Sequence, residues 1–177
     1  MNDTLVRRLD RFCERVGLGR LPGADSRILG AGYVLAATAL SVGVLFVVIS
    51  SALTVLVADA APSVAELRFV LAALPFVAVS AFCAAVAVWR VLPDGSPRYG
   101  ALGGVAATCL TYLLSTVFLF PVVLLVGDGT LSLSVSAAGV YTLLVALYGT
   151  ILTVWLTLPA GAAAGYLHES VRDYRNS

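Results

Sequence analysis

The chain has 177 residues, of which 60% are hydrophobic and 12% are charged, and its mean hydropathy is +0.98. A soluble domain carries about 25% charged residues, so this composition excludes an ordinary soluble domain and indicates a protein whose solvent is lipid. The net charge of +1 predicts no bulk attraction to nucleic acid.

Residues 1–27 form an arm rich in arginine, in which apolar residues recur on one helical face. We expect a cytoplasmic amphipathic helix that lies flat at the headgroup level, followed by a glycine-rich linker. A solvated helix packed on the protein's own loops is an equal alternative, and contact with a partner protein is a third. The apolar face and its arginines are Leu5, Leu9, Phe12, Arg7, Arg8 and Arg11.

Four apolar stretches follow, and each is long enough to cross a bilayer core, which needs about 20 helical residues. The first, Ile28–Ala58, contains no ionisable acid or base and is too long for a secretory signal. The segment 28–167 is therefore predicted to be a four-helix transmembrane domain. Its expected spans are about 28–58, 64–90, 97–120 and 136–158.

Capping signals locate two of the helix starts. Ser63 and Glu66 match a capping box, which places the start of the second helix near residue 64. Ser96 followed by Pro97 supplies an N-cap and a proline at the first helical position of the third helix.

Prolines also fall within or at the ends of the spans. Pro75 predicts a kink in the second helix, Pro121 a bend or a frayed end in the third, and Pro159 a break or kink in the fourth. The alternating stretch Thr130–Ser136 predicts an extended interfacial segment. Residues 168–177 are expected to form a cytoplasmic tail in water, with His168 as a solvated residue rather than a ligand.

The arginines predict how the chain is threaded. Four spans place ten of the eleven basic residues on one side of the membrane, and all of them are arginine. The positive-inside rule then predicts a multi-pass protein of the cell membrane with both termini in the cytoplasm.

The apolar stretches lack the side chains that catalysis and metal binding require. No Asp, Glu, His, Lys or Arg lies within Ile28–Ala58, Phe69–Trp89, Tyr99–Gly127 or Gly129–Leu167. Ionisable residues at membrane depth are the usual mark of ion pathways and proton relays. We therefore expect no enzyme, no cofactor and no metal site. Of the three cysteines, Cys13, Cys83 and Cys109, the last two fall inside apolar stretches and are interpreted as small apolar residues.

Small and hydroxyl-bearing residues form stripes on the third and fourth spans. Such faces allow helices to approach closely, and we interpret them as the packing seam of a bundle. The alternative is that the hydroxyl groups line a path for a neutral solute. The residues are Gly100, Gly104, Thr108, Thr111, Ser115, Thr150, Thr153, Thr157, Gly161 and Gly165.

Tyr141, Tyr148 and Trp155 repeat every seven residues on the fourth span. We expect this ridge to serve core packing and interface anchoring, with a docking ridge for a partner helix or a lipid-like ligand as the alternative.

Together these patterns predict an all-α integral membrane bundle of four transmembrane helices with an N-terminal interfacial helix. The function expected is a non-enzymatic accessory or oligomeric membrane subunit, whose partners are lipids and a second copy or another membrane protein. A channel or permease component for a neutral small solute is the second hypothesis.

Overall fold

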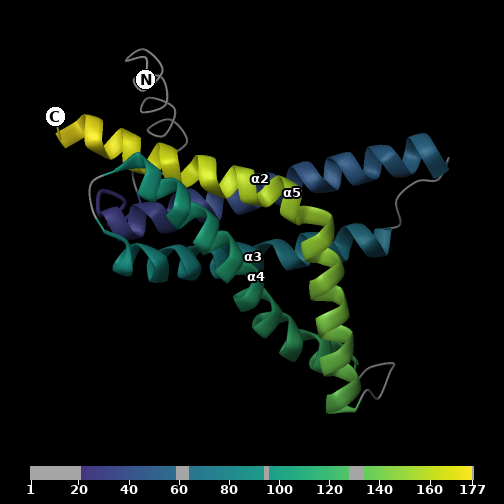
Figure 1. Ribbon diagram of the computed structural model, residues 1–177. Coiled ribbons are helices and arrows are strands. Elements are labelled where there is room, and N and C mark those ends of the chain that lie inside the picture. Colours follow the sequence, from purple (N-terminus) through teal and green to yellow (C-terminus); the bar gives the residue numbers. More distant parts are fainter. Residues whose placement is uncertain (1–20, 59–63, 94–95, 128–133, 177) are drawn as a thin grey trace.

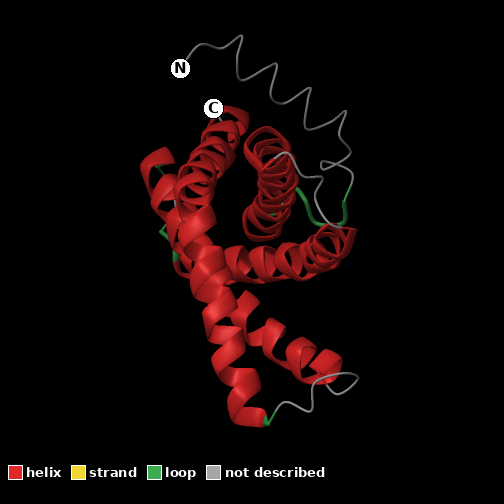
Figure 2. Ribbon diagram, turned by 90° about the vertical axis from the view of Figure 1, so that its right-hand side faces the viewer, coloured by secondary structure: helices red, strands yellow, loops and turns green. Residues whose placement is uncertain are grey.

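The computed structural model describes residues 21–58, 64–93, 96–127 and 134–176, and these residues form helices joined by short connections (Figure 1, Figure 2). The predicted interfacial helix around Leu5, Leu9 and Phe12 lies outside the described residues, as do residues 130–133 of the stretch expected to be extended. The helices are α2 (Arg27–Ala58), α3 (Val64–Val91), α4 (Pro97–Gly127) and α5 (Val135–Asn176).

All four helices are long and apolar enough to cross a membrane, which indicates a multi-pass membrane protein. α2 and α3 match the predicted spans to within a residue, whereas α4 and α5 continue past the predicted ends at 120 and 158. Pro121 and Pro159 lie inside these helices and do not end them. A proline removes one backbone hydrogen bond, but continuing the helix satisfies all the others, which matters most where no water is present.

The helices form two antiparallel hairpins that share one end and diverge at the other. α2 packs on α3 and α4 packs on α5, while α3–α4 and α2–α5 contacts join the two pairs. We call the shared end the base; α2 and α4 begin there, and α3 and α5 end there. The far ends of the α2–α3 arm and the α4–α5 arm point in different directions (Figure 1).

The divergence depends on a change of direction within α5. The C-terminal part of α5 lies along the base, whereas its N-terminal part leaves with α4 (Figure 1). Pro159 lies inside this helix, and a proline is the usual cause of a sharp kink.

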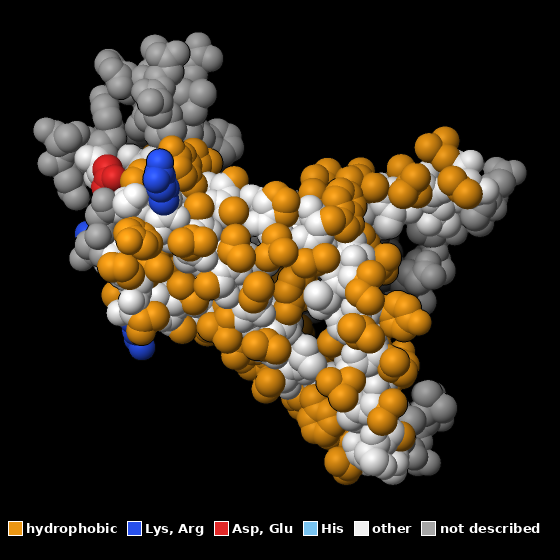
Figure 3. Space-filling view, viewed as in Figure 1, with side chains coloured by type: hydrophobic (Ala, Val, Ile, Leu, Met, Phe, Trp, Pro, Cys, Tyr) orange, Lys and Arg blue, Asp and Glu red, His pale blue; other side chains and the backbone are white. Residues whose placement is uncertain are grey.

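The core consists mainly of small residues, and the large apolar side chains point outward. Ala84, Ala85 and Ala107 are fully buried, whereas Leu56 is 80% exposed. On the face seen in Figure 3, hydrophobic side chains cover both arms and the charged side chains gather toward the base. This distribution suits lipid, in which small residues improve helix contact and large apolar residues need no burial.

Candidate functional site

Four glycines bring α4 and α5 into direct backbone contact near the base. A Cβ atom added to Gly104 would collide with the carbonyl oxygen of Gly161, and one added to Gly100 would collide with that of Gly165. A Cβ atom added to Gly165 would in turn collide with the carbonyl oxygen of Gly100. Only glycine permits this approach, so the structure joins the two small-residue stripes in register.

The hydroxyl-bearing residues beyond the glycine seam border a cavity between the two arms. The cavity has a volume of about 290 Å³. Its α4–α5 wall includes seven of the residues singled out from the sequence, namely Gly161 and six residues that carry hydroxyl groups. These six are Thr108, Thr111, Ser115, Thr150, Thr153 and Thr157.

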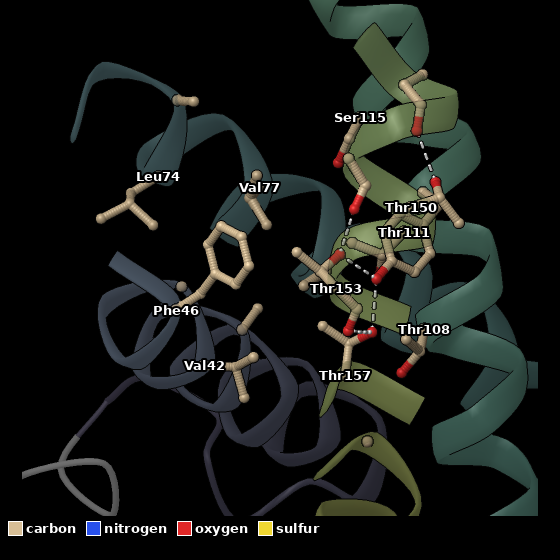
Figure 4. Close-up of a pocket in the computed structure, with 18 of the residues that line it drawn as sticks. Val42, Phe46, Leu74, Val77, Thr108, Thr111, Ser115, Thr150, Thr153 and Thr157 are labelled. Carbon is tan, nitrogen blue, oxygen red and sulfur yellow. Dashed lines mark hydrogen bonds between the residues drawn. The ribbon is translucent and has the colours of Figure 1, made fainter. Parts of the chain in front are cut away.

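The opposite wall comes from α2 and α3 and is apolar apart from Thr38. Figure 4 shows Phe46, Leu74 and Val77 facing the threonine-bearing helices across the cavity. Among the described residues that line the cavity, none is Asp, Glu, His, Lys or Arg. The described lining therefore carries no ionisable side chain. We call the α4–α5 side the polar wall because it carries nearly all of the hydroxyl groups, although Leu119, Val145 and Ala146 also belong to it.

Most hydroxyl protons on the polar wall are used within their own helices. Thr108, Thr111 and Thr150 donate to the carbonyl oxygens four residues earlier, at 2.8, 2.7 and 2.8 Å. This back-bonding is the usual behaviour of threonine within a helix. Because each oxygen keeps its lone pairs, these groups can accept hydrogen bonds from a neighbouring molecule but have no proton left to offer.

A second network joins α4 to α5 across the polar wall. The Tyr112 hydroxyl lies 2.7 Å from Thr153 Oγ1 and also makes a hydrogen bond with Thr157 Oγ1. The spacing of the threonines indicated a shared face, but it did not reveal Tyr112, which lies beside Thr111 and reads as an ordinary aromatic residue. Its role becomes visible only when α5 is placed against α4.

The base holds an ion pair that the sequence analysis missed. Arg27 Nε donates to Glu169 Oε1 at 2.9 Å, and the Trp89 indole N–H donates to the same oxygen at 2.8 Å. Arg27 also donates to the carbonyl oxygens of Leu92 and Pro93, each at 2.9 Å. One guanidinium therefore connects the start of α2, the connection after α3 and the end of α5.

His168 belongs to the same cluster. Its Nε2 lies 3.0 Å from the Arg27 carbonyl oxygen and must donate, because a carbonyl can only accept. The imidazole ring also meets the Trp89 indole edge to face, with centroids 6.0 Å apart. The expectation of a tail in water is wrong for Glu169 and Ser170, which are 3% and 6% exposed. The reason is that α5 continues as a helix and carries these residues onto the base.

The signal that could have revealed this cluster is positional. Arg27 immediately precedes the first uncharged stretch, Trp89 ends the second and Glu169 follows the last closely. In an antiparallel bundle, residues at these positions come to the same end. Within the described residues, no group of three or more His, Cys, Asp or Glu side chains could hold a metal ion.

A comparison with known proteins finds no family model, no curated protein and no solved structure that matches the chain.

Proposed function

We propose that this chain is a non-enzymatic subunit of the cell membrane that acts by associating with a second copy or with another membrane protein. In this proposal both termini lie in the cytoplasm, with the base on that side. Arg27, Arg90 and Arg98 lie at the base ends of their helices, and an excess of arginine on cytoplasmic flanks supports this orientation.

The observation that carries the proposal is the outward face of α5. Tyr141, Tyr148 and Trp155 are 56%, 65% and 62% exposed, so they do not pack in the core of one chain. They repeat every seven residues along α5, a spacing that keeps side chains on one side of a helix that pairs with another. Large aromatic side chains are also the residues on which binding energy concentrates. This ridge supports the docking of a partner helix.

Site-directed crosslinking in native membranes tests the proposal. Tyr148→Cys, in a chain whose own cysteines are replaced by serine, is expected to form a disulfide with a second copy or with one defined partner. Val79→Cys serves as the control, because Val79 is 54% exposed on α3 and lies away from the ridge. If cysteines introduced one at a time at positions 141, 148 and 155 all leave the chain as a monomer, the proposal is excluded.

The orientation has a separate test. A protease-sensitive tag at either end of the chain should be cut only when the cytoplasmic face of the membrane is open. A tag at one end that is cut from the opposite face would contradict the placement of both termini.

A specific observation favours a second candidate, a permeation path for a neutral small solute. Thr108, Thr111, Ser115, Thr150 and Thr153 all line one cavity. Purified protein in liposomes should then conduct a neutral solute, and the double substitution of Thr111 and Thr153 by valine should reduce the flux. Flux that is unchanged by these substitutions would exclude this candidate.

A further inference from the structure

We propose that the cavity between the two arms binds a neutral lipid that carries a hydroxyl group, such as a long-chain alcohol. Its hydrocarbon chain would lie against α2 and α3, and its hydroxyl group would lie against α4 and α5. The inference concerns a bound ligand and does not depend on which protein partner, if any, covers the ridge of α5.

The size of the cavity suits one end of such a molecule. Ligand sites in proteins typically have volumes of about 300–1,000 Å³ and are mostly apolar, with a few polar groups that set the orientation. This cavity, at about 290 Å³, lies at the lower limit of that range. Its lining is also mostly apolar, with its hydroxyl groups gathered on the α4–α5 side. The chain of a lipid can extend beyond it into the bilayer, because the cavity is open between the arms.

The hydrogen-bonding character of the polar wall selects a group that donates. Thr108, Thr111 and Thr150 have given their protons to backbone carbonyl oxygens and retain only lone pairs. A hydroxyl proton on a ligand finds acceptors here, whereas an alkane or an ether has no proton to offer.

Ser115 differs from these threonines because its hydroxyl proton is still available to donate. Its Oγ is buried and has no hydrogen-bond partner among the described residues, and Ser115 lines the cavity. A buried hydroxyl group without a partner costs about 1–3 kcal/mol. In the conformation described the Ser115 Oγ is shielded, so its side chain must rotate to face the cavity. A ligand hydroxyl group can then accept the Ser115 proton while donating its own proton to a threonine.

The absence of charge on the lining residues determines the class of lipid. No arginine, lysine or histidine among the described residues of the cavity could pair with a carboxylate or a phosphate. An ionised headgroup would therefore be buried without a partner, which is strongly unfavourable. A neutral alcohol meets no such penalty.

Photolabelling tests the proposal. The full chain is placed in phosphatidylcholine nanodiscs and labelled with hexadecanol that carries a diazirine in its alkyl chain. The label is expected on peptides of α2 and α3 that border the cavity, because the hydrocarbon chain carries the diazirine and lies against these two helices. Unlabelled hexadecanol should compete, whereas its methyl ether, hexadecane and palmitate should compete at least about threefold to tenfold less well, since one hydrogen bond is worth about 0.5–1.5 kcal/mol.

Two variants and two matched controls locate the site. Ser115→Ala should weaken competition by hexadecanol about threefold to tenfold. Ser41→Ala should leave competition unchanged, because Ser41 donates to Ala37 and does not line the cavity. Gly149→Leu should abolish specific labelling, because Gly149 lines the cavity and has no atom within 4 Å of an added Cβ. Gly139→Leu, on the same helix but outside the cavity lining, should label as the unaltered chain does.

Three results would overturn the proposal. Equal competition by the ether or the alkane would show ordinary solvation by lipid tails. Unchanged competition by hexadecanol in Ser115→Ala, together with undiminished specific labelling of Gly149→Leu, would place the alcohol elsewhere. Crosslinks from cavity residues to a second chain, with the label excluded, would show that protein fills the space. A monomeric result in the Tyr148→Cys experiment would end the subunit proposal and leave this one standing.

Discussion

The indole N–H of Trp89 donates a hydrogen bond to Glu169 Oε1 at 2.8 Å, and this contact joins residues 80 positions apart in the chain. Trp89 is 1% exposed and Glu169 is 3% exposed. The same carboxylate oxygen accepts from Arg27. The base is therefore held by one buried anion whose hydrogen-bond donors come from α2 and α3.

Removing the Glu169 side chain is expected to destabilise the base. Glu169→Ala removes the acceptor of the buried Trp89 indole N–H, and a buried donor left without its partner should cost about 1–3 kcal/mol of unfolding free energy. Glu169→Gln should cost less, because its amide oxygen can still accept from Trp89. The thermal midpoint of detergent-solubilised protein measures both. Asp173→Asn, exposed and four residues further along α5, is the control and should have little effect. Equal midpoints for all three variants would contradict the role assigned to Glu169.

A side chain at Gly104 is expected to separate α4 from α5. Even Gly104→Ala places its Cβ on the Gly161 backbone, and overpacking of this kind costs about 1–3 kcal/mol or more. Gly149→Ala is the matched control, because nothing lies within 4 Å of the added carbon. The thermal midpoint and the size-exclusion profile should separate the two variants clearly. If Gly104→Ala were as stable as the control, the backbone contact would not exist in the membrane.

Tyr112→Phe should produce a small loss of stability. It removes the hydroxyl group that contacts Thr153 and Thr157. Hydrogen bonds between membrane helices average about 0.6 kcal/mol, so the loss should be about 1 kcal/mol. Tyr141→Phe is the control, since Tyr141 is 56% exposed on the outer face of α5. A loss of several kcal/mol would mean that the ring, rather than its hydroxyl group, had been displaced.

The native thiols test insertion into the membrane. Cys83 and Cys109 are free and exposed on the protein surface. In native membranes, lipid should protect both from a charged, membrane-impermeant thiol reagent, and denaturation should release them. Cys13 is replaced by serine so that it does not contribute to the signal. Rapid labelling of either thiol before denaturation would show that water, and not lipid, covers that surface.

Several features of the fold could be predicted from residue order. The uncharged stretches and the caps at Ser63 and Ser96 predicted helices that begin near residues 64 and 97, and α3 and α4 begin there. The stripes containing Gly104 and Gly161 predicted small faces, and the structure puts these two glycines in contact. These signals are local, since each depends on residues within one or two helical turns.

Other features depended on how the helices meet. Pro159 predicted a break or a kink but could not show which, and the helix continues to Asn176. The threonine stripes were compatible with packing or with a path, and the structure shows back-bonded hydroxyl groups on the wall of a cavity. The ridge of Tyr148 and Trp155 was expected to serve partly in the core, yet it faces outward.

The order of residues by itself predicted four helices long and apolar enough to cross a membrane. It also predicted where all four begin and where the first two end, to within a residue, because hydrophobic length and capping act locally. Only the tertiary structure decided that Arg27, Trp89 and Glu169 share one buried cluster and that a neutral cavity separates the arms. Both features arise from the angle at which distant helices cross, and that angle is set by side-chain volumes and backbone contacts that no single stretch of sequence contains.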